Sequence, residues 1–169
     1  MTHTPHKHHY LRNTLDNLMP KPPLHSSKVA ARNKLMQDII RQLICQELSR
    51  DTSFLNVPIE SYCDKLMQQA EFALSFKQNV CQGFVAYYCN DKKTRVAYIT
   101  LIMVTPEWRN KGIGKALIHF VIERARTLEF RYLDLEVTKH NKAAIALYTR
   151  LGFAKVEERK EKWLMQYLL

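Results

Sequence analysis

The chain has 169 residues, of which 46% are apolar and 25% are charged, and its formal net charge is +10. This composition excludes disordered and fibrous classes and predicts one globular domain with a single core. No apolar run is long enough to cross a bilayer, and the first residues lack the apolar segment of a secretory signal, so we expect a cytoplasmic protein that stays out of membranes. The basic surface favours anionic partners, although it would equally serve solubility.

Residues 1–27 are predicted to form an arm. They hold four prolines and many polar residues, without a sustained apolar period. The histidines of this segment fit no closed metal site, because their spacing is wrong and no cysteine or carboxylate joins them. We therefore predict an arm over 1–27, a folded domain over 28–169, and no bound metal.

The first half of the folded domain indicates two helices followed by three strands. Apolar residues recur at helical spacing over 28–48, and Pro58 opens a second helical segment. Strand patterns follow at 71–76, 83–89 and 95–104. The polar sequence NDKK between the last two strands predicts a hairpin turn.

The second half alternates helices with strands. Helical periods cover 113–128 and 141–151, and alternating residues at 132–138 predict a strand between them. Two final strands are expected at 154–156 and 163–168, on either side of the charged turn EERKEK. This order predicts an α/β (α+β) fold with one mixed sheet and helices on both faces.

Gly112 and Gly114 are two of only four glycines, and they lie where a strand ends and a helix begins. Backbone N–H groups and the positive end of the helix dipole make such a junction a binding site for phosphate. Glycine lets the backbone approach the ligand closely. The spacing is not that of a Walker A loop. It is not that of the dinucleotide fingerprint G-x-G-x-x-G either, because Leu117 stands in place of the third glycine. A helix with a flexible first turn is the alternative interpretation.

Two segments resemble one family of enzymes. The sequence RNKGIG, after a strand that ends IMV, is similar to the [QR]-x-x-G-x-[GA] signature of the GNAT superfamily of N-acetyltransferases. LDLEVTKHNKAAIALYTRLGF, residues 133–153, resembles the L-x-L-x-V…N-x-x-A-x-x-x-Y-x-x-x-G-F segment of the same superfamily. One helix and one strand separate the two, as in the family, and the likeness covers about 94–157. It implies a mostly antiparallel sheet that splays at its centre.

The resemblance implies that acetyl-CoA is the co-substrate. Its pantetheine arm would pair with the backbone of the first splayed strand, and its pyrophosphate would lie on the N–H groups of the glycine loop. A backbone N–H near Met103 would stabilise the thioester oxygen. Asn141 resembles the asparagine that contacts the CoA arm, although an N-cap requires the same residue type. The cofactor-binding residues implied in this way are Ile102, Met103, Val104, Arg109, Asn110, Lys111, Gly112, Ile113, Gly114, Lys115 and Asn141.

The resemblance implies Tyr148 as the general acid that protonates the leaving thiolate. An unperturbed tyrosine is protonated at neutral pH, as this role requires. The alternative is an aromatic core residue that packs with Ala144 and Leu151. Glu136 is the candidate base, because alternation puts it on the polar face of a central strand and a related branch assigns a base at the matching L-E-V position. Its alternative role is a structural carboxylate.

The acceptor is expected to be a primary amine that attacks the thioester directly. A loose likeness of 56–104 to small bacterial acetyltransferases found with polysaccharide genes implies an amino sugar or a sugar nucleotide. A protein N-terminus or a lysine is the main alternative, and a CoA-binding module without turnover is another. Nucleic-acid binding through the arm has little support, because Tyr10 is the arm's only aromatic residue. We expect a monomer or a homodimer.

Overall fold

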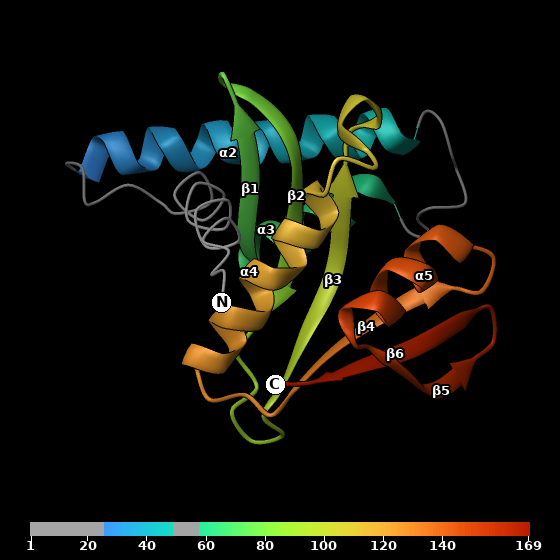
Figure 1. Cartoon of the computed structure of the whole chain (residues 1–169). Coiled ribbons are helices and arrows are strands. Elements are labelled where there is room, and N and C mark those ends of the chain that lie inside the picture. The colour runs from blue at the N-terminus through green and yellow to red at the C-terminus, as the bar shows by residue number, and fades with distance from the viewer. Residues whose placement is uncertain (1–25, 49–57) are drawn as a thin grey trace, which may run out of the picture. The chain divides into compact units, whose positions relative to one another are not determined.

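The structure, a computed structural model, describes residues 26–48 and 58–169 (Figure 1). Almost all of the predicted arm, with its histidines, therefore lies outside the described residues. The chain divides into two compact units, and one consists largely of 71–169 while the other holds the first two described helices. The elements are α2 Ser26–Leu48, α3 Ile59–Gln69, β1 Glu71–Lys77, β2 Val80–Tyr88, β3 Val96–Val104, the 3₁₀ helix η2 Pro106–Trp108, α4 Ile113–Thr127, β4 Tyr132–Thr138, α5 Lys142–Leu151, β5 Ala154–Arg159 and β6 Lys162–Leu168.

The smaller unit contains α2 and α3. Pro58 directly precedes α3 and caps it without a side-chain hydrogen bond, so the helix begins where the sequence predicts. Arg41 of α2 and Asp64 of α3 form an ion pair of 2.5 Å that joins the two helices. Neither α2 nor any other helix in the described ranges is long and apolar enough to cross a membrane.

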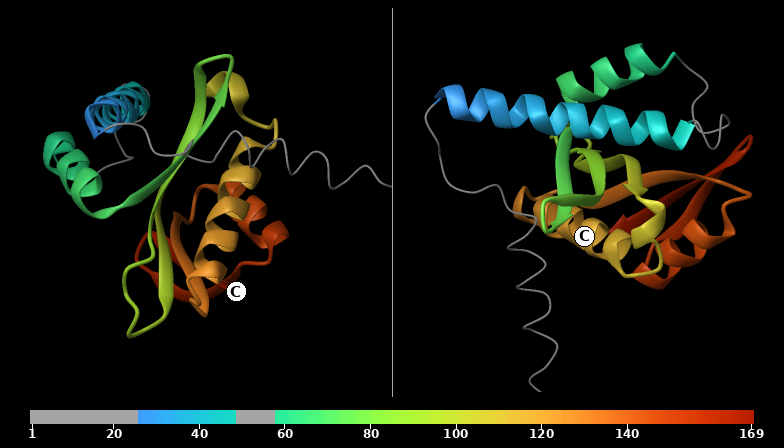
Figure 2. Two further views of the ribbon diagram at one scale, coloured as in Figure 1. Left: turned by 90° about the vertical axis from the view of Figure 1, so that its left-hand side faces the viewer. Right: turned by 90° about the horizontal axis from the view of Figure 1, so that it is seen from above.

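The larger unit is built on a sheet whose six described strands lie in the order β1-β2-β3-β4-β6-β5. All neighbours pair antiparallel except β3 and β4, which are parallel because α4 connects them. One face of this sheet buries the apolar sides of both α4 and α5, and they share a single core cluster with the strands (Figures 1 and 2). The apolar stripe that the sequence predicts for each helix is the side that packs here.

The two parallel strands separate halfway along their length. Their pairing begins at Val96 with Tyr132 and ends at Ile99 with Leu135, although β3 continues to Val104. The β2–β3 register also shifts beside this point. Ala97 and Ile99 contribute to the core cluster before the shift, whereas Ile102 and Val104 pack against it after the shift. An extra residue in β3 explains this change of face, because a bulge reverses the alternation of side chains.

The element boundaries differ from the sequence-based prediction mainly at the C-terminal hairpin. β5 runs to Arg159, three residues beyond the predicted end at Val156, and all six of its side chains are exposed. Apolar alternation could not find the end of this strand, since β5 lies at the edge of the sheet and alternates no buried side chain. The segment EERKEK, predicted as a turn, is therefore largely paired strand, and only its centre turns.

Candidate functional site

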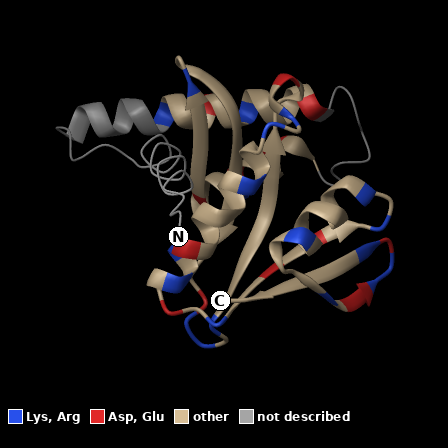
Figure 3. Ribbon diagram, viewed as in Figure 1, with Lys and Arg blue, Asp and Glu red and all other residues tan. Residues whose placement is uncertain are grey.

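A cavity of about 730 Å³ lies within the larger unit, where the separated end of β3 meets the start of α4 and the length of α5. It contains cationic, amide and small apolar side chains, and no Asp or Glu among the described residues lines it. Positive charges on α4 and α5 flank this region (Figure 3). The lining residues are Ile102, Val104, Trp108, Arg109, Asn110, Gly112, Ile113, Gly114, Lys115, Asn141, Ala143, Ala144, Ala146, Leu147, Tyr148 and Arg150.

All but three of the residues predicted for the site line this cavity. The exceptions are Met103, Lys111 and Glu136. Met103 is buried on the opposite face of β3, because the bulge turns its side chain away from the core cluster. Its backbone belongs to the separated stretch of β3, which is the part that the sequence analysis implicated.

The loop before α4 turns its backbone through two left-handed residues. Asn110 has φ 61° and Gly112 has φ 82°, and asparagine and glycine are the residues that adopt this region most readily. Among described groups, the N–H of Ala116 is the first in α4 to find an acceptor, the carbonyl of Gly112. The N–H groups from Asn110 to Lys115 donate to no described protein acceptor, as expected at a helix start. A Cβ on Gly112 would meet nothing within 4 Å.

The basic residues of this loop are held in defined positions. Arg109 Nε donates to the carbonyl oxygen of Val104 at 3.1 Å, which ties the loop to the end of β3. Lys111 Nζ lies 4.8 Å from the centre of the Trp108 ring, and Lys77 Nζ lies 5.1 Å from it. These contacts are cation–π interactions. The Trp108 ring, which lines the cavity, therefore holds two positively charged side chains next to it.

Asn141 combines the two roles that its sequence context suggests. Its side-chain Oδ1 accepts a hydrogen bond of 3.0 Å from the backbone N–H of Ala144, so it caps the N-terminus of α5. The same residue lines the cavity. The cap occupies Oδ1 and leaves the amide Nδ2 available as a donor to a ligand.

Tyr148 is buried in the core cluster with 6% of its surface exposed, and its ring lies 5.9 Å from that of Phe153. It also lines the cavity. Its hydroxyl makes no hydrogen bond to a described group. Every fully buried side-chain oxygen in the described part of the chain has a hydrogen-bond partner, so the Tyr148 hydroxyl oxygen is not fully buried. The hydroxyl therefore reaches the open space of the cavity. Burial raises the pKa of Tyr148 to about 12, which keeps the phenol protonated at neutral pH.

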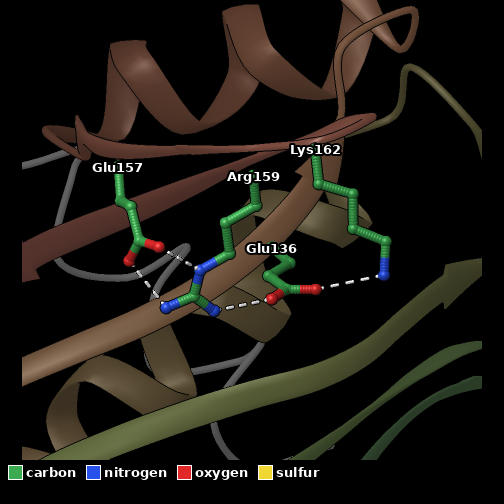
Figure 4. A network of polar contacts seen from close by, with 4 residues as sticks. All are labelled: Glu136, Glu157, Arg159 and Lys162. Atoms are coloured by element: carbon green, nitrogen blue, oxygen red, sulfur yellow. Dashed lines mark hydrogen bonds and ion pairs between the residues drawn. The ribbon is translucent and has the colours of Figure 1, made fainter.

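Glu136 lies on the face of β4 opposite to the core cluster (Figure 4). Its carboxylate accepts from Arg159 at 2.7 Å and from Lys162 at 3.0 Å, and Glu157 holds the other side of the Arg159 guanidinium. Partial burial favours the neutral form, but the hydrogen bonds and charges of Arg159 and Lys162 outweigh it. The pKa of Glu136 consequently lies below its usual value.

Several lining residues escaped the sequence analysis. Ala143 and Ala146 belong to a run of small residues along α5, and such a run is a signal that a helix face allows close approach. Trp108 gave no specific signal, because an aromatic side chain is ordinarily explained by core packing. Arg150 gave no signal of its own, because a cation in the last turn of a helix is ordinarily explained by the helix dipole.

The chain has relatives among known proteins. It is 45% identical over 86 residues to an uncharacterized N-acetyltransferase of Methanocaldococcus jannaschii, a match that covers 48% of this chain and 38% of that protein. It is 31% identical over 120 residues to an N-alpha-acetyltransferase of Arabidopsis thaliana, covering 70% and 61%. It is 39% identical over 92 residues to the ribosomal protein bS18-alanine N-acetyltransferase of Escherichia coli, a match that covers 54% of this chain and 62% of that protein. The chain thus spans less than two thirds of the length of each of these relatives.

Solved structures show the same fold. The PaiA N-acetyltransferase of Thermoplasma acidophilum, determined in complex with coenzyme A, superposes with a TM-score of 0.61 at 15% identity and covers 81% of this chain and 92% of its own. The ribosomal-protein-S18-alanine N-acetyltransferase of Escherichia coli gives 0.58 at 21% identity, covering 68% and 79%. These neighbours confirm the predicted mixed, centrally splayed sheet. The family model described as Acetyltransferase (GNAT) family matches residues 36–153, and the chain therefore belongs to this family.

Proposed function

We propose that this chain is an acetyl-CoA-dependent N-acetyltransferase that passes an acetyl group directly to a primary amine. One observation carries the proposal: β3 and β4 separate after Ile99, and the gap opens on a cavity that no Asp or Glu of the described residues lines. A strand edge that has lost its neighbour needs hydrogen-bond partners, and a cationic loop needs an anion. An extended amide arm that ends in phosphates, as in CoA, supplies both.

The residues of the chain divide the binding of the donor among them. The backbone edge of β3 over 102–104 pairs with the amides of the pantetheine arm, and the N–H groups of 110–115 bind the pyrophosphate. Asn141 donates from its free amide to the arm. A backbone N–H near Met103 stabilises charge on the thioester oxygen. Acetyl-CoA itself supplies an activated acyl carbon and a thiolate leaving group.

Tyr148 is the candidate donor to the leaving sulfur. Its hydroxyl opens into the cavity and stays protonated, since its pKa is raised to about 12. A thiol ionises near a pKa of about 8.5, so complete transfer of the phenol proton to a thiolate is uphill. We therefore assign the phenol a hydrogen bond that stabilises the developing sulfur charge, and the departing thiolate takes its proton from solvent.

Glu136 remains the candidate base. It is ionised at neutral pH and can accept the proton of the acceptor's amine through water, although its two cationic partners make it a weaker base than an unpaired carboxylate. Those ion pairs support a second role in which Glu136 fastens the ends of β5 and β6 to β4.

Two acceptor classes are open to a direct test. The sequence analysis suggests an amino sugar or sugar nucleotide, whereas one of the relatives is named an N-alpha-acetyltransferase and another a ribosomal protein bS18-alanine N-acetyltransferase. These names favour a peptide N-terminus for this chain. We further propose that residues 28–169 carry the activity without the arm of 1–27, in the cytoplasm, as a monomer or a homodimer. Nucleic acid and membranes are not among the proposed partners.

Thermal unfolding with and without acetyl-CoA tests the proposal. A ligand at about a hundred times its dissociation constant stabilises by roughly 2.7 kcal/mol, so we expect the midpoint to rise by several degrees. An unchanged midpoint at saturating concentrations would contradict the proposal. If the midpoint rises, chromatographic detection of free CoA with a panel of peptides, amino sugars and sugar nucleotides identifies the acceptor. Binding without turnover on any amine would favour the non-catalytic CoA-binding module.

A further inference from the structure

Gly83 lies inside β2, opposite Val104 of β3. Glycine weakens the interior of a strand, so its presence there calls for a reason such as the close approach of another backbone. A Cβ on Gly83 would lie 2.4 Å from the carbonyl oxygen of Met103 and 2.9 Å from the Cα of Val104. Both are backbone atoms, so no change of rotamer could relieve the overlap. Any side chain at this position would therefore push β2 and β3 apart.

The contact is with the part of β3 that has separated from β4. Parallel pairing ends at Ile99, and Met103 and Val104 lie beyond it. Val104 lines the cavity, and its carbonyl oxygen accepts the hydrogen bond of Arg109 from the loop before α4. Gly83 itself does not line the cavity. It can therefore act on the cavity only through the backbone of β3.

The two strands differ in how freely they could move apart. β2 is paired with β1 on its other side, and its residues Phe84 and Val85 are fully buried. Over 102–104, β3 pairs with β2 on one side, and no described strand pairs with it on the other. A side chain at Gly83 would consequently displace β3 rather than β2. The displacement would carry the backbone of β3 toward the gap between β3 and β4.

A β-bulge offers a simpler explanation for Gly83. The pairing of β1 with β2 skips Gln82, which is an extra residue in β2, and glycine is common at such irregularities. However, the three atoms nearest to a Cβ on Gly83 all belong to β3, and none belongs to β1. The steric requirement for glycine therefore comes from β3 and not from the bulge.

Thr105 holds the end of β3 in the same place by hydrogen bonding. Its backbone N–H donates to the carbonyl oxygen of Gln82 at 3.0 Å, and its Oγ1 donates to the same oxygen at 3.3 Å. The Gln82 side chain is fixed in turn, because its Oε1 accepts a hydrogen bond of 2.8 Å from the buried hydroxyl of Ser75. Two neighbouring residues of β2 thus keep the end of β3 close to β2.

We propose that Gly83 and Thr105 are positioning residues that keep the gap between β3 and β4 wide enough for the pantetheine arm of acetyl-CoA. Gly83 allows the close approach of β2 and β3, and Thr105 fastens it. The inference rests on the proposed function and adds two residues that do not line the cavity. The width of the donor site is accordingly set on the side of β3 that faces away from the donor.

Calorimetric titration of the full chain with CoA, together with thermal unfolding, tests the role of Gly83. We expect Gly83→Ala to lower the unfolding midpoint and to bind CoA about tenfold more weakly, because β3 moves into the gap. Met165→Ala is the matched control, since Met165 is a fully buried core residue of β6 that does not line the cavity. It should lower the midpoint and leave the CoA affinity within about twofold of the wild type.

Two results with these variants would overturn the inference. One is wild-type affinity for CoA in Gly83→Ala. The other is an equal loss of affinity in Met165→Ala, because lower stability alone would then explain the effect. Absence of CoA binding to the wild-type protein would instead remove the proposed function itself.

Thr105→Val decides the matter even if Gly83→Ala does not fold. It nearly keeps the shape of the side chain and removes only the Oγ1 hydrogen bond, so we expect the dissociation constant for CoA to rise about threefold. Thr127→Val is the matched control, because the Thr127 hydroxyl donates to the carbonyl oxygen of Glu123 at the end of α4, away from β3. It should leave the CoA affinity unchanged. Wild-type affinity in Thr105→Val, or an equal loss in Thr127→Val, would overturn the inference.

Discussion

At the residue scale, Gly112 and Gly114 belong to one short motif but have different structural requirements. Gly112 has φ 82°, and the space where its Cβ would lie is open. Gly114 is helical, and a Cβ there would make ordinary contacts with Leu147 and Val104. Gly112 thus serves the backbone turn and leaves open space beside it, while Gly114 could carry a methyl group without disturbing the packing of α4 against α5.

Substitution of the two glycines should separate these requirements. Gly112→Ala places a side chain in the left-handed region, which costs about 1 kcal/mol, and Gly112→Val costs more. We expect the dissociation constant for acetyl-CoA, measured by calorimetry, to rise by about tenfold or more in Gly112→Val. Gly114→Ala should leave the unfolding temperature nearly unchanged. Normal acetyl-CoA affinity in Gly112→Val would show that this glycine does not clear a path for the pyrophosphate.

Tyr148→Phe tests the role of the buried hydroxyl. Because the ring packs against Phe153 and only the hydroxyl reaches the cavity, the variant should fold normally. Loss of a hydrogen bond to the leaving sulfur should lower kcat by about 10²-fold while the affinity for acetyl-CoA stays the same. Steady-state kinetics together with calorimetry would measure both. Wild-type kcat in this variant would leave Tyr148 as a core residue alone.

At the element scale, β5 depends on pairing and charges rather than on a core, whereas its partner β6 buries Leu164 and Met165. Every residue of β5 is exposed, yet the strand pairs with β6 on both sides of a register shift between Lys155 and Glu157. The cluster of Glu136, Glu157, Arg159 and Lys162 joins the turn end of the β5–β6 hairpin to β4 (Figure 4). Exposed ion pairs contribute little singly, but a shared guanidinium makes this cluster a network.

Glu136→Gln should weaken the connection between this hairpin and β4. The folded pKa of Glu136 is depressed, so its stabilisation is complete above the unfolded pKa of about 4.3 and is lost as pH falls through the folded value. We expect the variant to unfold about 2 °C lower at neutral pH and to show a smaller loss of stability on acidification. Thermal unfolding across pH measures this effect, with Glu157→Gln as the control for the outer half of the network.

The pH–rate profile of the same variant decides whether Glu136 is the base. Because its pKa is lowered, Glu136 can generate an acidic limb only below about pH 4.5. An acidic limb at higher pH must come from another group, such as the amine of the acceptor, and should stay in place in Glu136→Gln. A limb above about pH 6 that disappears in the variant would contradict the ion-paired state described for Glu136.

At the scale of the whole molecule, the net charge of +10 suits a polyanionic donor. Exposed charges attract such a ligand over distances of about 10 Å at moderate salt, and salt screens this attraction. We expect the affinity for CoA, measured by calorimetry, to fall several-fold between about 0.05 M and about 0.5 M sodium chloride, while the affinity for pantetheine, which lacks phosphates, stays constant. Affinity for CoA that is independent of salt would place its phosphates away from the cationic side chains.

The sequence by itself determined the local elements and the backbone shape of the glycine loop before α4. Helical and strand periods placed β4 at its observed bounds and the start of α4 at Ile113, because these patterns depend on neighbouring residues alone. Asn110 and Gly112 are also local signals, since both tolerate a left-handed backbone. The motifs around them were sufficient to predict the family.

Only the tertiary structure decided how these pieces combine. The bulge that turns Ile102 toward the core cluster depends on the β2–β3 register, and Glu136 acquired two cationic partners because β6 pairs with β4 rather than with β3. Arg150 faces the cavity because α5 packs beside the first turn of α4. Each of these facts joins residues far apart in the chain, so no local period could predict it.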